Sequence, residues 1–167
     1  MVLFAVRLLL TIWGALAFRL TLGPKLAIAG VQPDLAAGLV FYLTLRRGGG
    51  FGILTGFILG LLVDVDRPEG IGITSLAWST MALFTAWLSE AMDATDPIVA
   101  GFLLFLAVLV AESIRALCVG GPDVGHFALI WIRWSLPIAA YTGVGVPLLV
   151  AGAGAILKER RWLGGRP

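Results

Sequence analysis

The chain has 167 residues, of which 59% are hydrophobic and only 13% charged, and its mean hydropathy is +0.99. This composition excludes an ordinary soluble domain, which is about half apolar and a quarter charged, and it predicts an integral membrane protein. The net charge of +2 is spread between apolar blocks, which excludes a nucleic-acid partner, and the single cysteine, Cys118, excludes an intrachain disulfide.

Apolar stretches of about 18 or more residues predict membrane-spanning helices, because a rise of about 1.5 Å per residue must cross a hydrocarbon core of about 30 Å. The first stretch resembles a signal peptide, since residues 15–17 form a small-x-small site. Arg7 comes late for such a peptide, however, and every later segment is also apolar, so we interpret this stretch as a retained span. Six spans are predicted, at residues 2–20, 26–45, 49–65, 71–89, 97–118 and 135–157.

The last apolar region, residues 127–157, would measure about 46 Å as one straight helix, which exceeds the hydrocarbon core. We therefore expect residues 130–134, with Trp131, Arg133 and Trp134, to form an aromatic and basic anchor near the interface. The span proper would begin at Ser135 and bend near one of the two prolines in it. No soluble block or long linker interrupts the chain, so the sequence predicts one all-α domain, a bundle of six transmembrane helices.

The orientation follows from lysine and arginine, which cytoplasmic loops retain. Arg46 and Arg47 lie between the second and third spans, and four more basic residues follow the sixth. Six crossings place both regions on the same side, so both termini are predicted to be cytoplasmic. The loop between the third and fourth spans is then extracytoplasmic.

Charged residues also occur at membrane depth. Asp34 follows Pro33, and we interpret it as a helix cap at the start of an unusually short helix, with a buried carboxylate that binds a partner or ligand as the alternative. Glu112 and Arg115 are three residues apart on the fifth span, so they are predicted to pair on the helix surface, with a proton or substrate pathway as the second interpretation. Arg133 can snorkel towards an interface.

Acidic residues and a histidine follow the third and fifth spans, and such groups can hold a metal or catalyse hydrolysis. No His-x-x-x-His, Cys-x-x-Cys or Gly-x-Ser-x-Gly spacing accompanies them, so we interpret them as solvated loop residues. The three glycines at 48–50 follow no strand and precede no lysine, unlike a phosphate-binding loop. The sequence therefore predicts no catalytic residue, metal site or cofactor. The loop residues are Asp64, Asp66, Arg67, Glu69, Asp123 and His126.

Glycines recur every four residues in the third span, and Asp64 takes the next place in this row. Each step of four drifts by about 40°, so Gly52, Gly56 and Gly60 share one smooth helix face that lets another backbone approach closely. Packing against another span of this chain is the preferred interpretation, and docking of a separate protein's transmembrane helix is the alternative. A second small-residue row in the sixth span marks a candidate mate: Gly143, Pro147, Ala151 and Ala155.

The order of these features resembles the rod shape-determining protein MreD family of bacteria. Its Pro-Asp, Arg-Arg-Gly and Gly-Phe-x-x-Gly-Leu-x-x-Asp pattern corresponds to residues 33–34, 46–48 and 56–64, and residues 70–73 open the next span. The resemblance is best over residues 32–90. One departure is Gly70, where the family usually has proline.

The resemblance implies a multi-pass scaffold of the bacterial inner membrane that acts in cell elongation and carries no catalytic residues. Family members bind MreC, which connects MreB filaments with the peptidoglycan polymerase RodA and its penicillin-binding transpeptidase. Their fold is similar to that of substrate-binding subunits of energy-coupling-factor vitamin transporters. The leading hypothesis is a non-enzymatic scaffold that offers the glycine face, or a neighbouring span, to a partner helix and the loop after Asp64 to that partner's extracytoplasmic part. The alternative is a vitamin-binding transport subunit, suggested by Asp34 and the Glu112 and Arg115 pair.

Overall fold

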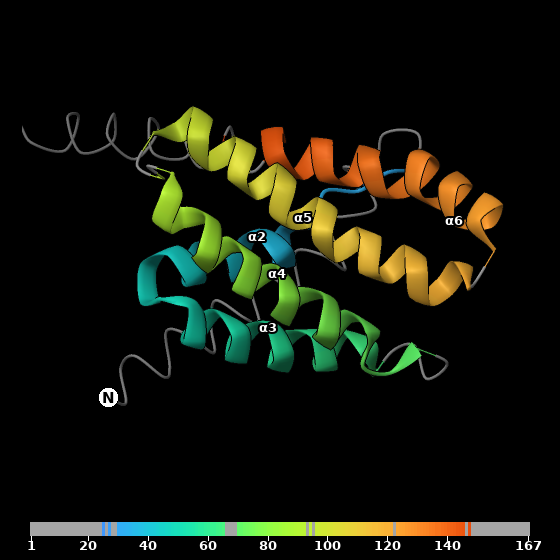
Figure 1. Cartoon of the computed structure of the whole chain (residues 1–167), viewed down its shortest axis with the longest axis horizontal. Helices are drawn as coiled ribbons and strands as arrows, with labels where there is room; N and C mark the ends of the chain where they lie inside the picture. Colours follow the sequence, from blue (N-terminus) through green and yellow to red (C-terminus); the bar gives the residue numbers. More distant parts are fainter. Residues whose placement is uncertain are drawn as a thin grey trace, which may run out of the picture.

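The computed structural model describes residues 25, 27, 30–65, 70–92, 94, 96–121, 123–145 and 147, and these residues form helices joined by short connections (Figure 1). The predicted first span and most of the second half of the sixth lie outside the described residues. The six-span bundle and its orientation therefore stay predictions. The elements are α2 (Leu35–Arg47), α3 (Gly49–Asp64), α4 (Ile73–Ala91), α5 (Pro97–Gly120), α6 (Val124–Ile130) and the π-helical segment η3 (Trp131–Ser135).

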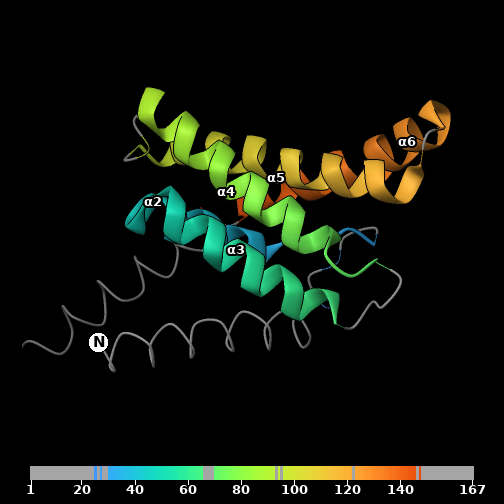
Figure 2. The same ribbon diagram turned by 60° about the horizontal axis from the view of Figure 1, so that its bottom comes forward.

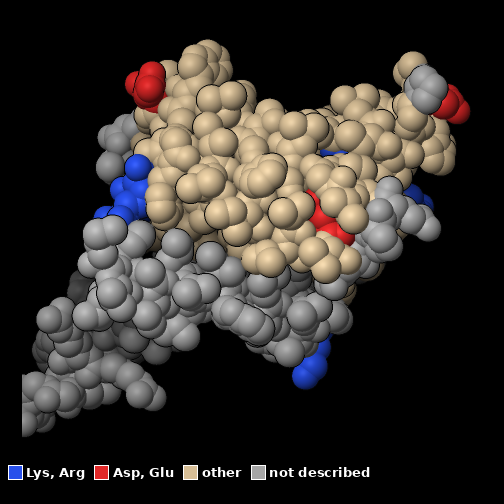
Figure 3. Space-filling view, turned by 90° about the horizontal axis from the view of Figure 1, so that it is seen from below, with Lys and Arg blue, Asp and Glu red and all other residues tan. Residues whose placement is uncertain are grey.

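Among the described residues, two helices are long and apolar enough to cross a membrane by length and composition. They are α5, with 24 residues, and the 22-residue helix Val124–Gly145, which contains α6 and η3. α3 is a shorter apolar helix of 16 residues, or about 24 Å. On the face that Figure 3 shows, the charged side chains lie mostly towards the two ends, and the surface between them is largely uncharged.

The bounds of α3, α4 and α5 agree with the predicted spans to within about two residues, but those of α2 do not. The second predicted span begins at residue 26, whereas residues 30–34 are not helical and α2 begins at Leu35. The reason is Pro33, since a proline disfavours helical backbone in the residue before it, while Asp34 caps the helix that follows. The short helix expected from Asp34 is thus present, with 13 residues.

The sixth span also differs from its predicted form. Residues 130–134 are not a segment separate from the span, because one helix runs from Val124 to Gly145 and contains them, and their place near the interface stays a prediction. Within it, the amide of Leu136 donates to the carbonyl of Trp131, five residues earlier, as in a π-helix. This wide turn comes directly before Pro137, which has no amide to donate. The irregularity expected near a proline is therefore a π-helical turn.

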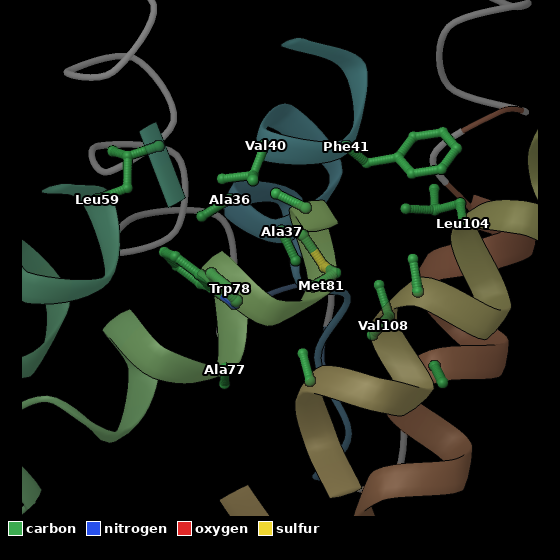
Figure 4. Packing of buried hydrophobic residues seen from close by; sticks show 14 of the residues in the cluster. Ala36, Ala37, Val40, Phe41, Leu59, Ala77, Trp78, Met81, Leu104 and Val108 are labelled. Atoms are coloured by element: carbon green, nitrogen blue, oxygen red, sulfur yellow. The ribbon is translucent and has the colours of Figure 1, made fainter. Parts of the chain in front are cut away.

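Helix α4 lies at the centre of the described fold and contacts α2, α3 and α5. Figure 2 shows α4 between α2 and α3 on one side and the α5–α6 hairpin on the other. Trp78 and Met81 of α4 are completely buried and meet Val40 of α2 and Val108 of α5 in one cluster (Figure 4). This packing fixes α2, α4 and α5 relative to one another.

The glycine face of α3 is filled by helices of the same chain. A Cβ atom added to Gly56 would lie 2.8 Å from the carbonyl oxygen of Trp78, and one added to Gly60 would lie 2.7 Å from the carbonyl carbon of Thr74. Gly52 faces the side chain of Thr44 on α2 in the same way. The glycine face thus packs within the chain, as the preferred interpretation has it. Its contacts with α2 and α4 leave no room for the helix of a partner.

The mate of the glycine row is α4 and not the sixth span. Gly143 packs instead on Gly101 and Phe105 of α5. Ala151 and Ala155 lie outside the described residues. The predicted pairing of the two small-residue rows is thus wrong at Gly143, because the short loop after α3 brings α4 back along it first.

We expect Gly60→Ala to destabilise the protein by about 1–3 kcal/mol, because the added methyl group collides with backbone atoms of α4 that have no freedom to move aside. Gly56→Leu and Gly60→Leu are expected to abolish accumulation in the membrane. The measurements are membrane yield and thermal denaturation in detergent.

Gly50→Leu is the matched control, because Gly50 lies in the same helix and a Cβ there meets nothing within 4 Å. Equal loss of yield in the Gly50 and Gly60 variants would show that helix propensity, and not the contact with α4, is responsible.

Candidate functional site

A polar cluster occupies the end of the fold where α3 ends and α2 and α4 begin. Its members are Asp34 of α2, Asp64 of α3, Thr74 of α4, and Glu112 and Arg115 of α5. Four helices thus contribute to one set of contacts. The three acidic residues and Arg115 were all singled out from the sequence, but only the pair on α5 was expected to meet.

Asp64 caps the helix that follows its own. It is the last residue of α3 and is only 2% exposed, and its carboxylate accepts hydrogen bonds from the amides of Gly72, Thr74 and Ser75 at 2.9, 3.0 and 3.2 Å. These amides belong to the first turn of α4, where the helix dipole favours a negative charge. The interpretation of Asp64 as a solvated loop residue is wrong, because its side chain turns back into the protein to accept these hydrogen bonds.

Arg115 is the centre of the cluster. Its guanidinium lies 2.5 Å from Glu112 Oε1 and 3.5 Å from Asp34 Oδ2, and it donates to the hydroxyl of Thr74 at 3.4 Å. It also lies over the ring of Trp78, 5.5 Å from the ring centre. The structure therefore contains the pair predicted from the spacing of Glu112 and Arg115, and it adds contacts to two further helices.

Asp34 is the helix cap predicted from the sequence, and it also pairs with a charge of the same chain. Its side chain accepts from the amide of Ala37 at 3.1 Å, which is the predicted helix cap, and its carboxylate also faces Arg115. Its own amide donates to the hydroxyl of Thr142 at 2.9 Å, which ties the start of α2 to the last helix. No sequence signal could have shown this contact, because 108 positions separate the two residues.

The helix that contains η3 closes the cluster from the far side of α5. Trp131 Nε1 donates to the hydroxyl of Ser113 at 2.9 Å, and the hydroxyl of Ser135 donates to the carbonyl oxygen of Glu112 at 3.4 Å. Two buried polar atoms next to the cluster, Ser75 Oγ and Trp78 Nε1, have no partner among the described residues. Polar groups on α2, α3, α4, α5 and η3 are thus assembled in one place.

The other residues considered from the sequence do not join the cluster. Asp123 caps α6 through the amide of Gly125, at the exposed tip of the α5–α6 hairpin, and His126 is exposed nearby. Asp66, Arg67 and Glu69 lie outside the described residues. Within the described part of the chain, no group of three or more His, Cys, Asp or Glu residues is arranged to hold a metal ion. What the cluster does by its contacts is to fix the helix ends relative to one another.

This architecture defines a class: an all-helical protein with helices apolar enough to cross a membrane, whose buried charges join helices at one end. The family model of the rod shape-determining protein MreD matches residues 1–140, and the chain belongs to this family. The family is membrane associated, determines rod shape and is a family of structural proteins rather than a known family of enzymes. Neither the curated proteins nor the solved structures that were compared contain a match.

We expect Asp64→Ala to destabilise the protein by at least about 1–3 kcal/mol, because three amides of α4 would lose their acceptor in a buried place. Asp64→Asn keeps one acceptor oxygen and is expected to lose less. Thermal denaturation in detergent measures both. The control is Asp123→Ala, which removes an exposed cap. Water can replace its carboxylate as the acceptor for the amide of Gly125, so the cost is about 1 kcal/mol or less. Equal losses at positions 64 and 123 would contradict the assigned role of Asp64.

We expect Arg115→Met to cost about 3–5 kcal/mol, because it leaves the carboxylates of Asp34 and Glu112 without their countercharge. The double variant Glu112→Gln, Arg115→Met is expected to lose less stability than the two single variants lose together, because it removes both charges of the close pair. Unfolding temperatures of the four proteins give the coupling. Strict additivity would show that the two side chains do not stabilise each other.

Proposed function

We propose that this chain is a multi-pass scaffold of the bacterial inner membrane that binds MreC and helps to position the peptidoglycan synthesis machinery. The partner's contacts would extend to RodA, the penicillin-binding transpeptidase and MreB. The role in shape determination follows from the family. The partner and the details of the complex are our proposal.

One observation carries the proposal of a positional rather than a chemical role. The charged side chains of the cluster, Asp34, Glu112 and Arg115, contact one another, and Asp34 also caps α2. Contacts of this kind fix the helices relative to one another, so the surface that they offer to a partner keeps one shape. They are also the residues that suggested a vitamin site, so their engagement favours the scaffold.

The surface available to a partner helix is the face of α3 opposite its glycines. Because α4 and α2 fill the glycine face, the large side chains on the other side of α3 point outwards and are exposed. They follow a spacing of three and four residues, which forms a continuous apolar stripe along a helix. We propose this stripe as the contact with the transmembrane helix of MreC: Leu54, Phe57, Ile58 and Leu61.

The full-length chain, purified in detergent from cells that co-express MreC of the same organism, is expected to retain MreC. A photo-crosslinking amino acid at Phe57 or Ile58 should label MreC, because these side chains lie on the proposed contact. The same probe at Trp87, an exposed position on α4, is the matched control and should not label it.

Failure of MreC to co-purify would overturn the proposed partner. Co-purification with labelling from position 87 and none from 57 or 58 would overturn the proposed face and keep the scaffold. A vitamin in the mass spectrum of the purified chain would instead favour the transport subunit.

A further inference from the structure

The segment η3 presents three consecutive side chains away from the protein. Trp131 and Ser135 are held against α5 by their hydrogen bonds to Ser113 and to the carbonyl of Glu112. The residues between them face outwards: Ile132 is 63% and Trp134 41% exposed, and Arg133 is exposed as well. The exposed side chain of Arg133 therefore lies on the outer face of a helix that is apolar enough to cross a membrane.

Arg133 differs from Arg115 in its partners. Arg115 faces two carboxylates, whereas the only contact of the Arg133 guanidinium within the described residues is the ring of Trp134, whose centre is 5.7 Å away. That ring lies beside Gly30, in the connection before α2, since a Cβ added to Gly30 would be 3.6 Å from two of its atoms. The cation thus has an aromatic neighbour and no anionic one among these residues.

The depth of Arg133 is set by its neighbours in the chain. Trp131 and Ser135 contact α5 at Ser113 and Glu112, so Arg133 lies level with the polar cluster. At this level α3 ends and α2 and α4 begin, while α5 and the helix from Val124 continue past it to the hairpin tip at Asp123. Because three helices end or begin here beside the charges of the cluster, we place the edge of the hydrocarbon at this level. A lone guanidinium facing lipid is costly in the hydrocarbon and turns to the nearest polar group at its edge.

The side chains around Arg133 suit acyl chains. Leu129, Ile132 and Leu136 are exposed and apolar, and they lie on the same helix within four residues of Arg133. Tryptophan is favoured at the edge of the hydrocarbon, where its ring is apolar and its N–H can reach water. The planar guanidinium matches two oxygens of a phosphate group, which is the anion that lipid head groups supply.

We infer that Arg133, flanked by Trp134, binds the phosphate group of a membrane phospholipid at this end of the bundle, with the acyl chains against Ile132 and its apolar neighbours. The site is separate from the proposed contact with MreC, so either inference can fail without the other. It would fix the height of the polar cluster relative to the head groups, since η3 is joined to the cluster through Glu112.

The test uses the full-length chain in detergent and a phosphatidylglycerol probe with a photoreactive group next to its head group. Labelling is expected on the peptide that contains residues 129–136. In Arg133→Gln it should fall about tenfold, as loss of a charged hydrogen-bonded pair implies. Arg133→Lys should retain an intermediate level, because lysine keeps the charge but not the paired donors.

The matched control is Arg46→Gln, which removes another exposed arginine that stacks on an aromatic ring, Tyr42, and leaves the labelling of this peptide unchanged. Unfolding temperatures of both variants check that each is folded. Equal labelling of the wild type and Arg133→Gln would overturn the site, as would equal labelling by a diacylglycerol probe without phosphate. Loss of labelling in excess inorganic phosphate would assign the site to free phosphate and overturn the lipid.

Discussion

The guanidinium of Arg115 is the interaction on which the rest of this structure depends. It joins the start of α2, through Asp34, to the start of α4, through Thr74, while Glu112 holds it on α5. In an apolar environment a charge without partners is expensive, so helices that share one are held in a single arrangement. Asp64 lies nearby as the last residue of α3, and its carboxylate accepts hydrogen bonds from amides at the start of α4. The free amides of one helix end are thus paired with the carboxylate of another.

Close packing of α3 on α4, away from the cluster, allows these helix ends to meet. Gly56 and Gly60 let α4 approach α3 so nearly that a methyl group would not fit, and this approach brings Asp64 within reach of the first turn of α4. The glycines cost helix propensity, but in a membrane the unpaired backbone is worse, so the helix persists. The large apolar side chains of α3 are left on the outside. The interior is thus closed by packing within the chain, and the outer surface is the part left for the contacts that we propose.

Much of the fold could be predicted from the sequence, and the errors have identifiable causes. The bounds of α3, α4 and α5 follow from hydropathy and helix length alone. The start of α2 does not, because hydropathy ignores the backbone restriction that Pro33 imposes. The predicted start of the sixth span at Ser135 rests on the length of one straight helix, which exceeds the hydrocarbon core. In the structure one helix runs from Val124 to Gly145, with a π-helical turn before Pro137.

For the site, the sequence by itself determined what lies within one helix. The pairing of Glu112 with Arg115 and the small face of α3 follow from spacings of three or four residues, since helical geometry makes such residues neighbours. The cap at Asp34 follows from an acid beside a proline at the start of a helix. Only the tertiary structure decided that Asp34 meets Arg115 and Thr142, that Asp64 caps α4, and that α4 fills the glycine face. These contacts join residues of different helices, and no local spacing records which helices meet. That choice is made by packing, where backbone shape and the need of each buried charge for a partner are satisfied together.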